Sequence, residues 1–307
     1  MTLTDTAHRA ARSPMTDVAV VVNSEKLGKR EQRALRLALT AAGCADVKWY
    51  DAPSGSRATA ATKKALKRGA RTVVVCGGDG TVRAAAEAVV GTSVALAIVP
   101  CGTANLLVSG LGLPTDIQDV VDTVVGGSRR RIDSAECNGR TFNVMAGVGF
   151  DVAMLDGAEA SKERLGFVAY MLSGVREARS RKRFHVTVTI DGQRFFSGRA
   201  SCVLVGNGGR LKGGVEAFPG ATPTDGRIHV AVLTAIGIRQ WSSLAISSVM
   251  RRQRWSAHAR LADGSTIVAE FRTRQRFEMD GGVKQRAKRL EFVIRPRALT
   301  LCVPPEH

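Results

Sequence analysis

The sequence predicts an α/β protein in which a domain built on a parallel sheet precedes a β-rich sandwich domain. Two observations support this fold class. In the first half, short and uniformly apolar runs alternate with helical patterns, which is typical of a parallel sheet covered by helices on both faces. In the second half, strand patterns follow one another across hairpin turns. With 307 residues the chain is long enough for two domains, each with its own core.

The first half consists of alternating strands and helices. In chain order we expect a strand at 18–23, a helix at 27–42, a strand at 47–50, a helix at 59–68, a strand at 73–76, a helix from about 81, a strand at 95–99, and helices at 103–110 and 117–125. Gly43 and Gly69 follow the first two helices, where glycine commonly ends a helix. In such a sheet the functional loops lie at the carboxyl ends of the strands.

The second half contains mostly strands. In chain order we expect strands at 132–137 and 141–148, a helix at 163–180, and strands at 184–190, 194–205, 228–233, 266–271, 276–280 and 290–294. Asn138-Gly139 and Asp191-Gly192 are two-residue hairpin turns.

The change in pattern near residues 126–131 sets the domain boundaries. We expect the α/β domain at 17–128 and the β-sandwich domain at 129–296. Residues 1–16 form a disordered extension in which Met15 is an alternative start, and 297–307 return to the first domain as an edge strand.

A net charge of +18 is the strongest compositional signal. Lysine and arginine concentrate at 176–183, 251–255, 272–276 and 284–289. Such a surface attracts nucleic acid or an anionic membrane face, although arginine that serves only solubility is the alternative. Aromatic residues make up 5% of the chain, too few for base-stacking platforms, so nucleic-acid binding is not expected.

Features that the sequence lacks indicate where the protein is located and in what state its cysteines are. No apolar run approaches about 18 residues, and the N-terminal residues do not resemble a secretory signal. Six scattered cysteines without metal-ligand spacing indicate buried, reduced thiols. We therefore expect a cytoplasmic protein without disulfides or a structural zinc site.

A glycine-rich turn follows the strand at 73–76. Gly77, Gly78 and Gly80 surround Asp79, and a helix begins near Thr81. A helix N-terminus preceded by residues without Cβ is suited to bind phosphate. Bound magnesium would offset the negative charge of Asp79. The alternative is a tight turn with Asp79 as a solvated cap.

A second polar turn follows the strand at 95–99. It runs from Pro100 to Asn105 and offers the Thr103 hydroxyl and the Asn105 amide to a phosphate or a substrate hydroxyl. The alternative is that Thr103 only caps a helix. Asn23 ends the first strand, and all three strand ends can converge on one crevice.

Polar and glycine-rich segments also occur in the second half. Glycine-rich loops lie at 205–209 and 212–214, and Asp225-Gly226 is a turn signal. Glu278 and Asp280 fall on one face of the strand expected at 276–280, where paired carboxylates can chelate a metal, act as bases or simply edge a turn.

Together these motifs resemble the diacylglycerol kinase and sphingosine kinase catalytic-domain family, in its bacterial lipid kinase branch. The motifs are GGDGT at 77–81, PCGTAN at 100–105, Asp133, NVMAGVGFD at 143–151, VGNGG at 205–209, and the Asp-Gly pairs at 225–226 and 280–281. They occur in the family's order from about Asp17 to the C-terminus. NAD kinases share the first motif and phosphofructokinases resemble it.

The resemblance implies a fold and a set of site residues. The fold is a Rossmann-like nucleotide-binding domain of the phosphofructokinase and NAD kinase type, followed by a β-sandwich, with lipid entering between them. Asp225 matches an acidic ligand of a magnesium site. The residues expected beside ATP are Asn23, Ser24, Gly77, Gly78, Asp79, Gly80, Thr81, Arg83, Gly102, Thr103 and Asn105.

The chain departs from the family pattern at three places. Arg83 and Ala84 replace an Asn-Glu pair, and Arg83 could contact phosphate through its guanidinium. Ala52 stands near the position where many members of the family carry a nucleotide-contacting threonine. Gly282 replaces the glutamate that usually acts as catalytic base, so Asp79 and Asp280 are the remaining candidates for the catalytic residues.

We therefore expect an ATP- and Mg²⁺-dependent kinase that phosphorylates the hydroxyl of a membrane lipid, most simply diacylglycerol, at the anionic inner face of the membrane. The alternative, motivated by Gly282, is a catalytically weak or inactive member that binds nucleotide or lipid. An NAD kinase would carry a different loop after its fourth strand. Oligomeric state stays open, a homodimer included. Apolar residues that could select the lipid are Phe150, Met154, Phe167, Tyr170 and Met171.

Overall fold

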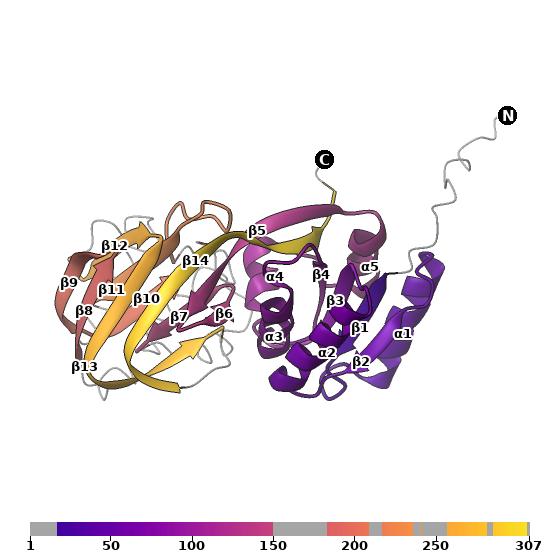
Figure 1. Cartoon of the computed structure of the whole chain (residues 1–307), viewed down its shortest axis with the longest axis horizontal. Coiled ribbons are helices and arrows are strands. Elements are labelled where there is room, and N and C mark those ends of the chain that lie inside the picture. Colours follow the sequence, from indigo (N-terminus) through magenta and orange to yellow (C-terminus); the bar gives the residue numbers. More distant parts are fainter. Residues whose placement is uncertain are drawn as a thin grey trace.

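A parallel sheet forms the centre of the first of two lobes that lie along the long axis of the molecule (Figure 1). The computed structural model describes residues 17–149, 183–208, 217–235, 240, 257–280 and 285–305. The parallel strands are β1 (Val18–Val22), β2 (Lys48–Asp51), β3 (Thr72–Gly77) and β4 (Ala95–Pro100), in the order β2-β1-β3-β4. Every residue of β1 and β3 is buried, as the uniformly apolar runs predicted.

Helices cover both faces of this sheet. They are α1 (Lys29–Ala41), α2 (Gly55–Lys67), α3 (Asp79–Val89), α4 (Leu106–Leu111) and α5 (Ile117–Val125). Val20 belongs to the core shared with α1 and α5, whereas Val21 belongs to the core shared with α2, α3 and α4. Successive strand residues therefore face opposite layers, which is the geometry of a strand between two helical layers.

The second lobe is a β-sandwich. Its strands include β6 (Arg140–Phe142), β7 (Met145–Val148), β8 (Phe184–Ile190), β9 (Gln193–Ala200), β10 (Cys202–Gly206), β11 (Ile228–Leu233), β12 (Ala259–Gly264) and β13 (Thr266–Met279). The run β12-β11-β10-β7 joins one half of β13, and β8 and β9 join the other half, all in antiparallel pairs. Side chains such as Val188, Val230 and Phe292 fill the core.

Four predicted strands differ from the observed ones. The strand expected at 194–205 divides at Ser201 into β9 and β10. The segments expected at 266–271 and 276–280 form one strand, β13, whose register shifts between Glu270 and Gln275. The hairpin about Asn138-Gly139 pairs β6 with the preceding strand, but β7 pairs with β10 and β13 instead.

Two long strands connect the lobes (Figure 1). They are β5 (Ser128–Cys137) and β14 (Gln285–Val303), which run antiparallel to each other. The end of β14 returns to the first lobe and pairs in parallel with β4 through Thr300 and Leu301. The expected edge position is wrong, because β14 lies between β4 and β5, and β5 covers the edge that β14 would otherwise expose.

Asp133 fixes the place where β5 and β14 cross between the lobes. Its carboxylate is fully buried and accepts the backbone N–H groups of Arg297 and Gly226, each at 2.7 Å. Arg297 has a positive φ of 50° inside the irregularity of β14 between Arg295 and Leu299. The carboxylate thus satisfies a backbone N–H that the β5–β14 ladder leaves unpaired, which buried backbone groups require.

Two further sequence expectations concern thiols and membrane spans. The described cysteines are free, and all except Cys101 are buried. Burial raises the pKa of the Cys137 thiol to about 12 and that of Cys101 to about 11. Within the described ranges, no helix has both the length and the apolar character needed to cross a bilayer.

Candidate active site

The carboxyl ends of β1, β3 and β4 meet at one edge of the parallel sheet. Asn23 donates its N–H to the Cys76 carbonyl at 2.8 Å, and Cys101 donates to the Gly77 carbonyl at 2.9 Å. The three polar strand ends are therefore adjacent, as the sequence predicted. This edge includes the point between β1 and β3 where the strand order reverses, and ligands commonly bind at such a point in open α/β sheets.

The two glycine turns touch each other through residues that have no side chain. A Cβ atom on Gly102 would lie 2.7 Å from the Cα of Gly78, and one on Gly78 would lie 3.1 Å from the Cα of Gly102. Gly77 is required for another reason, because its Cβ would lie 2.5 Å from the Cβ of Thr81. Gly80 faces open space, with no atom within 4 Å of the position that a Cβ would take. A phosphate could approach the backbone there.

Asp79 links the two turns. Its Oδ2 accepts the N–H of Asn105 at 3.0 Å, and its Oδ1 accepts the N–H of Leu106 at 2.6 Å. The carboxylate therefore caps α4, a helix that begins 27 residues further along the chain, rather than its own helix α3. The alternative of a solvated cap on α3 is wrong, since both carboxylate oxygens accept N–H groups at the start of α4.

Asn105 holds the second turn in shape. It has a positive φ of 46°, and its side chain accepts the Gly102 N–H at 3.0 Å and donates to the Gly102 carbonyl at 2.7 Å. The left-handed backbone delays the helix to Leu106, so the expected helix start and N-cap at Thr103 are wrong. Thr103 is exposed at the rim of the turn.

Asn23 is buried and connects three segments. Its amide donates to the Thr81 hydroxyl and to the Pro53 carbonyl, both at 3.4 Å, and its oxygen accepts the Glu25 N–H at 3.1 Å. Ser24 follows as an exposed residue. The position expected for a nucleotide-contacting threonine is Ala52, which is completely buried.

Lys26 is a site residue that the sequence analysis missed. Its Nζ lies 3.0 Å from the position that a Cβ on Gly78 would take, so its ammonium group lies against the glycine turn. Its charge also lowers the pKa of the Cys101 thiol, although burial has the larger effect and raises it. In a strongly basic chain a single lysine does not stand out from the others. The sequence feature that could have pointed to Lys26 is its position shortly after the end of a strand.

Asp280 lies at the junction of the lobes, just past the end of β13. It is 4% exposed, and its carboxylate accepts backbone N–H groups from Asn143 at 2.8 Å and from Val144 and Met145 at 3.0 Å each. Burial raises its pKa from 3.8 to about 6, while these hydrogen bonds and the charge of Arg83 act in the opposite direction. Its positive φ of 43° interrupts the extended backbone. The alternation of side chains along a strand, from which we expected Asp280 and Glu278 on the same face, therefore ends before Asp280.

Arg83 faces this junction. It is 7% exposed and lies near the Glu87 carboxylate at 3.4 Å and the Thr141 carbonyl at 3.5 Å. Its Nε has no hydrogen-bond partner among the described residues. The positive charge of Arg83 lowers the pKa of Asp280, which indicates that the guanidinium lies near that carboxylate. The predicted phosphate contact of Arg83 stays a prediction.

Asp225 organises the turn before β11. Its oxygens accept the N–H groups of Thr222 at 2.8 Å and Arg227 at 2.9 Å, and Oδ2 lies 3.1 Å from the Nε2 of His229. No group of three or more His, Cys, Asp or Glu side chains that could hold a metal gathers within the described ranges. A magnesium ion at Asp225 would therefore depend on backbone carbonyls, and this ligand role stays a prediction.

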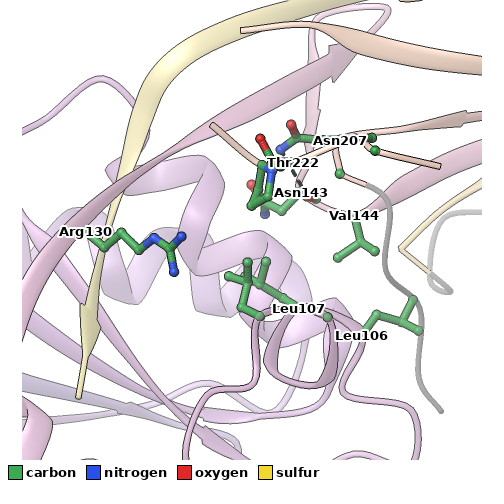
Figure 2. A pocket seen from close by; sticks show the side chains of 13 residues that line it. Leu106, Leu107, Arg130, Asn143, Val144, Asn207 and Thr222 are labelled. Atoms are coloured by element: carbon green, nitrogen blue, oxygen red, sulfur yellow. Dashed lines mark hydrogen bonds between the residues drawn. The ribbon is translucent and has the colours of Figure 1, made fainter. Parts of the chain in front are cut away.

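A cavity of about 320 Å³ opens between α4 and the second lobe. In Figure 2 the α4 leucines lie across the opening from the two asparagines, with Arg130 to one side. Its lining is Leu106, Leu107, Gly110, Leu111, Arg130, Asn143, Val144, Asn207, Gly208, Gly220, Ala221, Thr222 and Pro223. The apolar residues at 150, 154, 167, 170 and 171, and also Gly282, lie outside the described residues.

Comparison with known proteins identifies relatives for both lobes. The profile of the diacylglycerol kinase catalytic domain matches residues 17–137, and that of the YegS C-terminal NAD kinase beta sandwich-like domain matches 144–302. The chain is 28% identical over 252 residues to a Cronobacter sakazakii protein named probable lipid kinase YegS-like, covering 79% of this chain and 81% of that one. An uncharacterized Synechocystis protein is 29% identical over 241 residues, covering 76% of this chain but 55% of its own length.

Solved structures show the same fold. A diacylglycerol kinase from Bacillus anthracis is similar with a TM-score of 0.69 and 19% identity, over 95% of this chain and 98% of that one. Two other structures of Bacillus anthracis proteins have TM-scores of 0.77 and 0.74. An NAD kinase from Archaeoglobus fulgidus, solved in complex with ATP, gives a TM-score of 0.51 at 11% identity, covering 93% of each chain.

The contact between the glycine turns can be tested by two matched substitutions. We expect Gly102→Ala to lower the free energy of unfolding by about 1–3 kcal/mol, because its Cβ would overlap the Gly78 backbone. Gly80→Ala adds the same methyl group into open space and should leave stability unchanged or slightly raised. Urea denaturation of both variants measures the difference. Equal stability of the two variants would show that the turns do not need to touch.

The raised pKa of Asp280 predicts a pH dependence of stability. The folded protein holds this proton more tightly than the unfolded chain does, so the contribution of Asp280 is fully present below pH 3.8 and is lost as the pH rises through about 6. Asp280→Asn imitates the neutral form. From pH 4 to 7 the wild type should lose up to about 3 kcal/mol relative to this variant. A pH-independent gap in denaturation experiments would contradict the shift.

Proposed function

This chain belongs to the family of proteins that join a diacylglycerol kinase catalytic domain to a YegS-type C-terminal domain, and we propose that it is an ATP- and Mg²⁺-dependent kinase that phosphorylates a lipid hydroxyl, most simply that of diacylglycerol. One observation carries the proposal. The Asp79 carboxylate joins two glycine turns at adjacent strand ends, beside an uncapped helix N-terminus. This arrangement is suited to hold phosphate groups.

The residues present fit the phosphates of a nucleotide. Gly80 leaves open space where α3 begins, and the Lys26 ammonium lies against the same turn. Backbone N–H groups, the positive end of the helix dipole and a lysine together attract a polyphosphate. Ser24 and Thr103 are exposed residues at the rim. We propose that ATP binds across this edge of the sheet.

Asp79 is the carboxylate at the glycine turns and fits a magnesium ion that accompanies the nucleotide. Magnesium in proteins usually retains water and is bound by one or two carboxylates together with phosphate oxygens. When bound, the ion would supply positive charge against the negative charge that develops on the transferred phosphoryl group. Asp79 would also orient the lipid hydroxyl.

Asp280 is our proposal for the proton acceptor, since Gly282 has no side chain to act as base. With a pKa of about 6 it is mostly ionised at neutral pH. Its Oδ1 accepts two backbone N–H groups but Oδ2 accepts one from the described residues, and a carboxylate oxygen has two lone pairs. The hydroxyl could donate to Oδ2 directly or through water. Such a base contributes about 10²–10⁴-fold in rate.

The same hydrogen bonds favour a second candidate function. Three backbone N–H groups on the Asp280 carboxylate suffice to explain why it is buried, and then Asp280 need not replace the missing glutamate. The protein would bind nucleotide and lipid with little or no turnover.

The second lobe would dock on anionic lipid. Exposed basic residues on neighbouring stretches of β13 and β14 are Arg272, Arg274, Arg276, Arg286, Lys288 and Arg289. Each basic residue near an anionic bilayer contributes on the order of 1 kcal/mol. Arg289 is partly offset by Glu270 and Glu291, so we expect the other five to contribute more.

The kinase proposal predicts turnover of ATP on lipid vesicles that depends on Asp79. With radiolabelled ATP and vesicles of several hydroxyl-bearing lipids, Asp79→Asn should be about 10²–10⁴-fold slower than the wild type, since one oxygen of the site is replaced by an amide. Asp116→Asn is the matched control, because asparagine caps α5 as well as aspartate does. If Asp79→Asn equals the wild type on every lipid, the kinase proposal fails.

The Gly282→Glu variant separates the two candidate functions in the same assay. New activity from an otherwise inactive chain would support the binding-only function. An active wild type that gains nothing from Gly282→Glu would exclude it.

The position of Lys26 against the glycine turn predicts that removing its charge weakens nucleotide binding. Removing its charge with Lys26→Gln should weaken ATP binding by about 10-fold, the size expected for one charge-assisted contact to phosphate. Titration calorimetry with ATP measures the dissociation constant. Lys67→Gln, at the far end of α2, is the control and should bind like the wild type. Equal affinities for both variants would place the phosphates elsewhere.

A further inference from the structure

Helix α2 of the first lobe has an exposed face on which every charged residue is positive. With its C-cap, these residues are Arg57, Lys63, Lys64, Lys67 and Arg68. Residues 55–71 contain no aspartate or glutamate. Within the part of the chain that the structure describes, none of these five side chains forms an ion pair. The described residues therefore do not neutralise the charge of α2.

The spacing of the five residues gathers their charge on one side of the helix. Arg57, Lys64 and Arg68 follow one another at i, i+7 and i+11, which is a single stripe along a helix, and Lys63 and Lys67 flank it. The opposite side of α2 packs on the sheet through small buried residues, which are Ala58, Ala61, Thr62 and Ala65. The apolar side of α2 is thus occupied, and its basic side faces solvent.

This arrangement is unfavourable for the helix itself. Lys63 and Lys67, and likewise Lys64 and Arg68, are like-charge pairs at i, i+4, which destabilise a helix. The helix dipole offsets part of this cost in the last turn. Solubility is served equally well by charges of mixed sign. A face of one sign that repels itself therefore favours a binding surface over a merely solvated one.

The charge of the first lobe is also divided between the two sides of its sheet. The exposed charged residues of α5 are all acidic, and they are Asp116, Asp119 and Asp122. α2 shares its core with α3 and α4, whereas α5 shares its core with α1, so α2 and α5 lie on opposite sides of the strands (Figure 1). The basic residues of α1 are balanced in that layer by Glu31 and the aspartates of α5. A negative surface would therefore attract the lobe with α2 in front.

The shape and composition of α2 indicate the kind of partner. Residues 55–71 contain no aromatic side chain on which a base could stack, which argues against single-stranded nucleic acid. A helix of 13 residues presents its charges along about 20 Å of a straight line. A bilayer with anionic headgroups offers a flat surface of negative charge that needs no specific geometry. The basic stretches of β13 and β14 provide the second lobe with a surface of the same kind.

We propose that α2 is the surface through which the first lobe docks on an anionic bilayer, so that the protein binds the membrane with both lobes. The proposal rests on the proposed function, because a lipid acceptor brings the protein to a bilayer. The helix lies on the headgroups without inserting, since its apolar side is packed on the sheet. Two linked contacts bind a surface more tightly than either contact alone.

Two sets of substitutions that remove the same charge test the proposal. The α2 variant combines Lys63→Gln, Lys67→Gln and Arg68→Gln. The control variant of α1 combines Lys29→Gln, Arg30→Gln and Arg33→Gln, all at exposed positions of the opposite layer. Lys64 is kept because its Nζ lies 5.9 Å from the centre of the Tyr50 ring.

Binding of the nucleotide-free full-length chain is measured by sedimentation with vesicles of phosphatidylcholine and phosphatidylglycerol. Each basic residue near the surface contributes about fivefold in affinity, so the α2 variant should bind about 10–100-fold more weakly than the wild type. The α1 variant should stay within about threefold of the wild type. Equal losses in both variants would mean that only net charge matters, and would overturn the proposal.

A pair of single charge reversals covers the case in which the triple variant is poorly folded. Arg57→Glu and Arg30→Glu each place an acidic residue in the first turn of a helix, where the helix dipole favours it. We expect Arg57→Glu to weaken vesicle binding about 10-fold and Arg30→Glu to leave it nearly unchanged. Circular dichroism checks that each variant is folded.

The outcomes separate this inference from the proposed function. Vesicle binding that depends on α2, without turnover of any lipid, would support the docking surface and refute the kinase. Wild-type turnover together with equal vesicle binding by the α1 and α2 variants would overturn the inference and leave the kinase intact. Tighter binding of a single-stranded RNA oligonucleotide than of anionic vesicles, lost in the α2 variant, would assign the surface to nucleic acid and also overturn the inference.

Discussion

The hydrogen bonds that the Asp79 carboxylate accepts from the N–H groups of Asn105 and Leu106 are the constraint on which the candidate site depends. These two hydrogen bonds span 26 and 27 residues of the chain. They hold the two glycine turns against each other and determine where α4 begins. Because α4 is short and lacks a side-chain cap of its own, the carboxylate is the group that satisfies its first N–H groups. The same bond sets the apolar wall of the cavity, since Leu106 and Leu107 follow directly.

Carboxylates hold the other junctions of the molecule in the same way. Asp280 gathers three N–H groups of residues 143–145 across a separation of 137 residues, and Asp133 joins segments 93 and 164 residues away. In each case the accepting carboxylate meets backbone that leaves the regular ladder, where N–H groups would otherwise be buried without partners. Charge-assisted hydrogen bonds are stronger than neutral ones, which offsets part of the cost of burying the charge.

Local patterns predicted most of the fold and the place of the site, but not the contacts within it. The apolar runs of β1 and β3 and the strand ends at Asn23, Gly77 and Pro100 identified the sheet and the edge where its polar strand ends meet, because burial and turn chemistry act over a few residues. The strand β13 was divided in the prediction because Arg272 to Arg274 are exposed and polar, which resembles a loop. In the structure β13 continues through them, although its register with β14 shifts between Glu270 and Gln275. Lys26 and the cap by Asp79 depend on residues far apart in the chain, and no local pattern specifies such pairs.

The structural role of Asp280 is compatible with the role of proton acceptor that we propose for it, because of how its hydrogen bonds are divided between the two oxygens. If the carboxylate were held by donors on all lone pairs, its pKa would fall far below 7 and it would be a poor base. Burial opposes the three N–H groups, so the pKa is raised to about 6 and the group accepts a proton more readily than an exposed aspartate would. The carboxylate that holds residues 143–145 therefore has a proton affinity that suits the role of proton acceptor that we propose for it.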